Sequence, residues 1–150
     1  MLPRWHILLG AIFTLILYVA VPEISLINLS LVFLSSFLID FDHYLASLTK
    51  TKKLSLKHSF EYHKQVGIKQ QKDLEKGIKR KGDFHLFHTI EFHILIAVLS
   101  IFFNPLFYVF IGMLFHSLLD IISLLQTSLI HVREYFLFNW ITRALSKNQL

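Results

Sequence analysis

The chain has 150 residues, enough for one domain, and 54% of them are apolar, with a mean hydropathy of +0.55. This apolar content exceeds what a soluble domain of this size needs to fill its core, so the composition predicts an integral membrane protein. Because the chain has no cysteine, disulfides and thiolate metal ligands are excluded, and any metal must be bound by His, Asp, Glu, backbone or water.

The net charge of +5 is unevenly distributed along the chain. Residues 49–82 hold eleven Lys or Arg and three Asp or Glu, whereas the rest of the chain is acidic on balance. A basic block can bind nucleic acid, but beside apolar segments it is more typical of a cytoplasmic loop that touches anionic lipid. We therefore expect membrane lipid as the partner and no specific nucleic-acid binding.

The first apolar segment runs from about Trp5 to Val21, with Arg4 before it and Pro22 after it. A cleaved signal peptide is one interpretation, but a proline directly after the cleavage position and a second apolar run favour an uncleaved span. The second segment runs from Ile24 to Leu48 and is long enough to cross a bilayer.

Residues 49–82 have no continuous apolar stripe and are predicted to form a solvated or surface-lying helical hairpin. Two more membrane helices are expected at 84–103 and 106–125, joined by a turn at Asn104-Pro105. The aromatic tail, 128–145, is expected to form an interfacial helix. The predicted fold is an all-α integral membrane bundle of about four transmembrane helices in a single domain, 1–150.

The basic loop and the even number of spans also predict a topology. The positive-inside rule places residues 49–82 in the cytoplasm, and an even number of crossings then places both termini there too. The chain is accordingly expected to be a multi-pass protein of the cell membrane.

Three of the predicted spans carry ionisable groups at a similar depth. At 1.5 Å per residue, Asp40 lies about 12 Å from the cytoplasmic end of its helix, and Glu91 and Asp120 lie about 10 Å from theirs. His116 and Asp120 are spaced i, i+4, and His88 and Glu91 are spaced i, i+3, so each pair shares a helix face. These stripes predict that Asp40, His88, His116 and Asp120 lie close together inside the bundle.

Asp42 and His43 adjoin this layer. Asp40 and His43 share a face, but Asp42 points roughly 200° around the helix from Asp40. Both aspartates can therefore serve one site only at a helix end or where the helix unwinds. His85 precedes His88 by three residues.

The negative charges of the acidic side chains in this layer must be compensated inside a membrane. No Lys or Arg lies between Trp5 and Leu48 or between Phe84 and Leu129, so ion pairs within the spans do not account for them. Protonated acids with hydrogen bonds, a proton or ion pathway, and a divalent metal site are the alternatives. Imidazole with carboxylate favours the metal, with Zn²⁺ or Mn²⁺ as the ion that suits these ligands.

The other histidines carry weaker signals. His6 and His131 are expected near the membrane interfaces without a special role, and His58 and His63 are expected to be solvated. His93 lies about 140° around the helix from His88 and is expected to pack or to support a ligand indirectly.

Three motifs give the chain a family resemblance: Asp40-Phe41-Asp42-His43 after an apolar helix, His88-Thr89, and Gly112 followed by His116-Ser117-Leu118-Leu119-Asp120. In this order they resemble the membrane-bound metal-dependent hydrolases, a family also described as LexA-binding inner-membrane-associated hydrolases. The family's centre often reads H-R-G-x-T-H-S, whereas the present chain lacks that arginine and glycine. The family's H-x-x-x-D motif resembles that of zinc-dependent phospholipases C and P1 nuclease, which implies phosphoester chemistry.

Together with the predicted metal site, this resemblance implies a metal-dependent hydrolase of phosphoesters, such as an anionic lipid headgroup, at the cytoplasmic membrane face. The expected metal ligands are Asp40, Asp42, His43, His88, His116 and Asp120. Glu91 is the expected general base, and Asp42 is a further candidate for a catalytic role. The alternative is a non-catalytic membrane protein, either an ion- or proton-conducting bundle or an assembly factor with a structural metal. A site closed by four protein ligands favours structure, and a position open to water favours catalysis.

Overall fold

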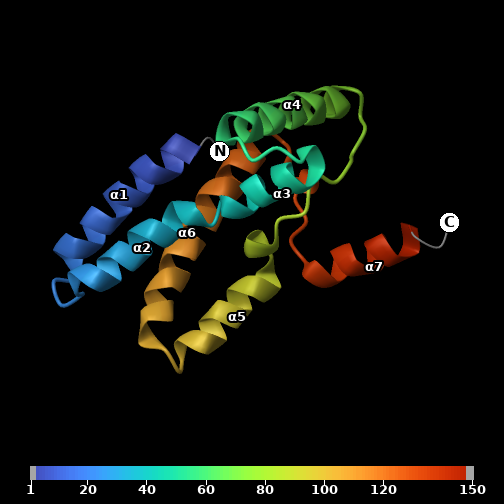
Figure 1. Cartoon of the computed structure of the whole chain (residues 1–150). Helices are drawn as coiled ribbons and strands as arrows, with labels where there is room; N and C mark the ends of the chain where they lie inside the picture. The colour runs from blue at the N-terminus through green and yellow to red at the C-terminus, as the bar shows by residue number, and fades with distance from the viewer. Residues whose placement is uncertain (1–2, 148–150) are drawn as a thin grey trace.

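The computed structural model describes residues 3–147, with the backbone alone at Lys147, and these residues form helices joined by turns, with no strand (Figure 1). The predicted all-α class is confirmed. Two helical hairpins lie side by side, α1 with α2 and α5 with α6, and α4 lies across the end of the bundle opposite to the hairpin turns.

The first hairpin consists of α1 (Pro3–Ala20) and α2 (Leu26–Leu38). Ser25 caps α2 by accepting a hydrogen bond from the Asn28 N–H. The helices approach closely at Gly10, where an added Cβ would lie 2.1 Å from Ser36 Oγ. Small residues at such a contact are typical of helix packing in lipid, because they let the two backbones come together.

The longest helix, α6 (Asn104–Gln126), packs mainly against α2. Pro105 occupies its first turn, where a missing N–H costs no hydrogen bond. Gly112 faces α2, and a Cβ at this position would lie 2.3 Å from the Val32 carbonyl oxygen and 2.0 Å from Ser35 Oγ. This close contact fixes the register of α6 on α2 and so sets the height of His116, one turn further along α6.

The segment predicted as one helix over 24–48 is interrupted. The α2 helix ends at Leu38, and α3 (Phe41–Thr51) begins after a turn at Ile39–Asp40. The Asp40 N–H bonds the carbonyl of Phe37, three residues back, instead of that of Ser36. The chain continues in the same general direction, so that 26–51 together are long enough and apolar enough to cross a membrane.

The basic segment forms one helix, α4 (Leu56–Glu75), and the predicted hairpin is wrong. Residues 78–85, after α4, are irregular. Tyr44 Oη, on α3, donates a hydrogen bond to the Leu54 carbonyl just before α4, and Tyr62 Oη, on α4, donates one to Asp83 Oδ2. These bonds connect α4 to α3 and to the irregular segment that follows it. Burial raises the pKa of Tyr62 to about 12, and the bond to Asp83 acts in the same direction, so the phenol remains a donor at neutral pH.

The helix predicted over 84–103 is also shorter than expected. Residues Leu86–His88 form a 3-10 turn, η1, and the α-helix α5 covers only Ile90–Ser100. Thr89 begins it, with its hydroxyl accepting a hydrogen bond from the Phe92 N–H. His85, His88 and Glu91 therefore do not form the helical stripe that their spacing predicted.

The end of the described chain contains η2 (Ile130–Val132) and the separate helix α7 (Leu137–Lys147). Trp140 stacks on Phe84 with ring centroids 4.3 Å apart, and Arg143 pairs with Glu134. Phe138, Ile141 and Leu145 of α7 are exposed, and the interfacial position of this helix stays a prediction.

Among the described residues, three stretches are long and apolar enough to span a membrane: Pro3–Ala20, Leu26–Thr51 and Asn104–Gln126. Large apolar side chains such as Leu15, Val19 and Ile27 are exposed on them. This surface is consistent with membrane association, because such side chains gain from contact with lipid. The α5 helix, with eleven residues, is too short to count as a fourth span by itself.

Candidate metal centre

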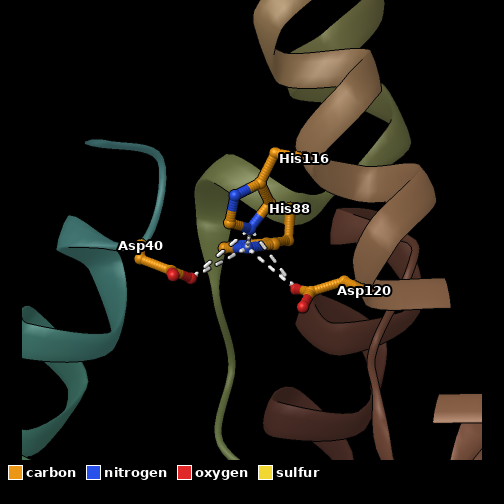
Figure 2. A group of neighbouring side chains, drawn as sticks. All are labelled: Asp40, His88, His116 and Asp120. Carbon is orange, nitrogen blue, oxygen red and sulfur yellow. Dashed lines mark hydrogen bonds and ion pairs between the residues drawn. The ribbon is translucent and has the colours of Figure 1, made fainter. Parts of the chain in front are cut away.

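Four side chains from three parts of the chain meet inside the bundle (Figure 2). Asp40 comes from the turn between α2 and α3, His88 from η1, and His116 and Asp120 from successive turns of α6. One ligand atom from each residue lies within 4.8 Å of the others, so the predicted proximity is confirmed. We call these four residues the inner cluster.

The ligand atoms of the inner cluster lie close to one another. His88 Nε2 lies 3.1 Å from His116 Nε2, 3.7 Å from Asp40 Oδ1 and 3.6 Å from Asp120 Oδ2. His116 Nε2 lies 3.4 Å from each of the same two carboxylate oxygens. Figure 2 shows the two aspartates approaching the imidazoles from opposite sides.

The outer nitrogens of both imidazoles define their tautomers. His88 Nδ1 lies 3.0 Å from Asp42 Oδ2, and His116 Nδ1 lies 2.9 Å from the Ser36 carbonyl oxygen. Both partners are acceptors when Asp42 is ionised, so each Nδ1 carries a hydrogen, and in the neutral form of either ring Nε2 presents a lone pair to the inner cluster. Lone pairs and carboxylates gathered in this way repel one another unless a proton or a cation lies between them.

The interruption after α2 supports this arrangement. The Ser36 carbonyl is turned to His116 because the Asp40 N–H no longer bonds to it. Asp40 stands at the N-cap of α3, where an aspartate ordinarily accepts hydrogen bonds from the helix, but its side chain makes no such bond. Its carboxylate is directed to the inner cluster instead, at the expense of helix capping.

Asp42 takes a supporting position. Its Oδ2 accepts hydrogen bonds from the Phe87 N–H at 2.9 Å and from His88 Nδ1, and so it holds η1 in place. The predicted obstacle, that Asp40 and Asp42 point to opposite sides of one helix, is removed by the turn at Asp40. A carboxylate that binds the outer nitrogen of a ligand histidine fixes its ring and raises its basicity.

Asp120 has two partners that the sequence did not reveal. Arg133 Nη2 lies 2.7 Å from Asp120 Oδ2, and His6 Nε2 lies 3.2 Å from Asp120 Oδ1. His6 is fully buried, and its ring stacks on that of His116 with centroids 4.0 Å apart. The expectation that His6 has no special role is therefore wrong, and Arg133, from outside the predicted spans, supplies Asp120 with a fixed cation.

A second group of imidazoles lies beside the inner cluster. The rings of His43 and His85 are tilted by 44° with centroids 3.8 Å apart, and His43 Nε2 lies 3.4 Å from Asp40 Oδ1. His85 Nδ1 lies 3.7 Å from Asp42 Oδ1. His63, which was expected to be solvated, bonds the His43 carbonyl oxygen through Nε2 at 2.8 Å. Asp42, His43 and His88 also have ligand atoms within 4.8 Å of one another.

Glu91 is placed away from both groups. Its carboxylate accepts hydrogen bonds from the N–H groups of Leu137 and Phe138, at the start of α7. The i, i+3 spacing with His88 fails because a 3-10 turn ends between the two residues, and Glu91 serves as an anchor for α7. His93 bridges the Thr89 carbonyl and Ser117 Oγ between α5 and α6, which agrees with the packing role expected for it.

A cavity of about 1190 Å³ adjoins the inner cluster beneath α4. Asp40, Asp120 and Arg133 line it on one side, together with His43 and His85. Asp42 and Glu91 are not among its lining residues. The inner cluster therefore faces the cavity through its two carboxylates, while its imidazoles are directed into the bundle.

The residues of this centre can hold a metal ion, with two imidazoles and two carboxylates as donors. Comparisons of the chain with models of protein families, with curated proteins and with solved structures found no match.

Proposed function

We propose that the protein is a metal-dependent hydrolase that cleaves phosphoesters at the membrane. The observation that carries the proposal is the close mutual approach of two imidazole nitrogens and two carboxylate oxygens in the inner cluster. Ligands placed 2.0–2.1 Å from a tetrahedral zinc ion are separated by about 3.3–3.4 Å, by geometry. The five separations measured here run from 3.1 to 3.7 Å.

The chemistry of the donors also fits a divalent ion, and zinc best. The tautomers direct both Nε2 lone pairs inward, and neutral imidazole is the form that binds metals. The carboxylates of Asp40 and Asp120 balance the two positive charges. Asp42 accepts a hydrogen bond from the outer nitrogen of His88, and a carboxylate bonded to a ligand histidine in this way is common around zinc. Manganese, which accepts more oxygen ligands, suits the same residues less closely.

When bound, such an ion supplies a positive centre that polarises a phosphoryl oxygen and acidifies water. The chain's own residues arrange the rest. Arg133 donates one hydrogen bond to Asp120, and its guanidinium has further N–H groups that can donate to phosphoryl oxygens in the cavity. His43, which lines the cavity beside Asp40, is the proton carrier in our proposal, in place of Glu91. Water supplies the oxygen that bonds to phosphorus, the ester P–O bond breaks, and the leaving alkoxide takes up the proton.

One observation favours the alternative of a structural metal. Four protein ligands already complete a tetrahedral shell, which is typical of structural zinc. Hydrolysis needs an open position, and Asp40 is the residue that can provide one, because its side chain is 17% exposed whereas that of Asp120 is 3% exposed. We therefore propose that Asp40 moves aside for substrate or water, and that the other three residues keep the ion.

The experiment that tests this function combines metal analysis with an activity screen. We expect purified protein to contain about one zinc per chain and to hydrolyse a chromogenic phosphodiester or phosphomonoester, with loss of activity after chelation and recovery on adding zinc. His43→Gln should lower kcat with zinc retained, and His58→Gln, outside the cavity, is its control. A full complement of tightly held zinc without hydrolysis of any phosphoester would favour the structural role.

Asp42 provides a second test of the metal centre. Asp42→Asn keeps the size of the side chain but weakens its hold on His88 Nδ1, so we expect zinc affinity to fall by about 10–100-fold. The measurement is a competition titration with a chelator of known affinity, with Asp83→Asn as the control for loss of a nearby carboxylate. Unchanged affinity would show that Asp42 does not orient the histidine.

We further propose that the chain crosses the membrane four times, with the third crossing formed by residues 84–103. Only 90–100 are α-helical, but several backbone groups before this helix are satisfied internally: the Phe87 N–H bonds Asp42 and the Ile90 N–H bonds the Tyr135 carbonyl. Reporters placed near Lys72 and after Lys147 should then both report the cytoplasm. Opposite locations for the two reporters would mean an odd number of crossings.

A further inference from the structure

We infer that the substrate of the proposed hydrolase is a membrane lipid, a phosphate ester carried on long hydrocarbon chains, which reaches the inner cluster from the bilayer through the cavity beneath α4. The inference rests on the proposed function for its chemistry, but its evidence is the shape and lining of the cavity.

The cavity is large and mostly apolar. Its volume of about 1190 Å³ exceeds the roughly 300–1,000 Å³ of common ligand pockets. Much of its apolar lining forms two walls, Phe37, Leu38 and Phe41 at the junction of α2 and α3, and Leu56, Phe60 and Val66 on α4. A nucleotide or sugar phosphate would place polar groups next to these apolar side chains, which is unfavourable. Acyl chains would bury apolar surface there, which stabilises binding.

The rim of the cavity is open at the height of the membrane helices. Leu38, Phe41, Leu56 and Phe60 line the cavity and are each 52–63% exposed. Leu38 and Phe41 belong to the stretch 26–51, which is apolar enough to span a bilayer. The exposed faces of Leu38 and Phe41 therefore join the apolar outer surface of the span to the apolar lining of the cavity. The acyl chains of a lipid can then stay in contact with hydrocarbon while its headgroup reaches Asp40.

The charges around the cavity suit an anionic headgroup. Four cationic side chains line it: Arg4, Lys57, Lys64 and Arg133. Of the four acids in the lining, Asp40 and Asp120 belong to the inner cluster, and the other two already accept hydrogen bonds, Asp83 from Tyr62 and Glu61 from Gln65. With a divalent ion held by the inner cluster, the lining is positive on balance, which favours a phosphate over a neutral headgroup.

The first experiment compares each lipid with its own headgroup. Dioleoyl phosphatidic acid and dioleoyl phosphatidylglycerol, in phosphatidylcholine nanodiscs with the zinc-loaded protein, represent the monoester and the diester. Their soluble counterparts are glycerophosphate and glycerophosphoglycerol. We expect kcat/KM for one of the lipids to exceed that of its headgroup by at least about 100-fold, because several buried methylene groups contribute to binding. Equal values would overturn the inference and leave the hydrolase proposal standing.

Variants of the two walls sharpen this test. Phe41→Ala and Phe60→Ala should lower the preference for lipid over headgroup by about tenfold each, since each removes an aromatic side chain from the chain-binding wall. Phe102→Ala is the matched control, because Phe102 is 74% exposed on the turn between α5 and α6 and lies outside the cavity lining. Wall variants that behave like this control would contradict the inference.

A binding experiment remains decisive if the protein hydrolyses nothing. Phosphatidic acid with a photoreactive acyl chain, present as a trace in the nanodiscs, should label residues 37–44 and 56–67. Excess phosphatidic acid should compete with this labelling, and excess diacylglycerol should not. Lys57→Gln with Lys64→Gln should weaken the labelling, whereas Lys76→Gln, outside the cavity lining, should not. Competed labelling without hydrolysis would refute the enzyme and keep the lipid site, and labelling that no anionic lipid displaces would refute the lipid site.

Discussion

Asp120→Asn is expected to remove most of the metal from the purified protein and, with it, any phosphoester hydrolysis. The substitution keeps the size and the hydrogen-bonding capacity of the side chain but deletes the negative charge 3.4 Å from His116 Nε2. Substitution of a residue that supports a metal ligand lowers metal affinity by about 10–100-fold. Loss of a ligand itself should have a larger effect, so we expect zinc affinity to fall by more than about 100-fold. His116→Ala should have the same effect. Zinc content by atomic spectroscopy is the measurement.

The control is Asp73→Asn, because Asp73 lies on α4 beside Arg80 and outside the inner cluster. Asp120 also pairs with Arg133, so the variant is expected to be less stable whether or not a metal is involved. Metal content separates the two roles. If Asp120→Asn and His116→Ala both retain zinc at the wild-type level, the inner cluster is a hydrogen-bonded polar core and its assignment as a metal site is refuted.

The proximity of the four inner residues was predictable because it depends on regular helix geometry. His116 and Asp120 are one turn apart on a helix that the sequence marks clearly, and the rise per residue places Asp40 at a similar depth. The residues that α6 contributes are therefore found where a continuous helix places them. For His88 only the proximity was predicted correctly, because η1 orients its ring in a way that helix periodicity does not describe.

Glu91 shows where this reasoning fails. A spacing of three residues implies a shared face only if the helix is continuous between them, and Thr89 caps α5 just before Glu91. The threonine followed by an apolar run was a signal for a helix start at this position. This signal places Glu91 inside the helix and His88 before it, so the two residues need not share a helix face.

Arg133 and His6 were missed for a different reason. Arg133 lies outside the predicted spans, and His6, although it lies at the start of the first span, is neither Lys nor Arg and was not expected to be a partner of the acids. Arg133 returns to Asp120 because η2 reverses the chain just after α6, a tertiary effect without a local sequence signal. His6 did carry a signal, since the predicted topology places the start of the first span on the same side of the membrane as the layer of ionisable residues.

Removing the metal from the wild-type protein is expected to destabilise it by a measurable amount. The inner cluster joins the α2–α3 turn, η1 and α6, so an ion held there links three segments that are distant in the sequence. At a free zinc concentration 100 times the dissociation constant, binding stabilises the folded state by about 2.7 kcal/mol. With about 2–4 °C per kcal/mol for a chain of this size, we expect chelation to lower Tm by roughly 5–10 °C.

The sign of this effect follows from linkage, because an ion that binds only the folded state must raise Tm, and its removal must lower it. Adding zinc back should restore the original Tm, and Mg²⁺, which avoids imidazole ligands, should not. Asp120→Asn should have a low Tm that no longer responds to the chelator, which distinguishes loss of the ion from a general effect of the reagent. A wild-type Tm that is the same with and without chelator would mean that protons shared among the imidazoles and carboxylates, and not a metal, hold the inner cluster together.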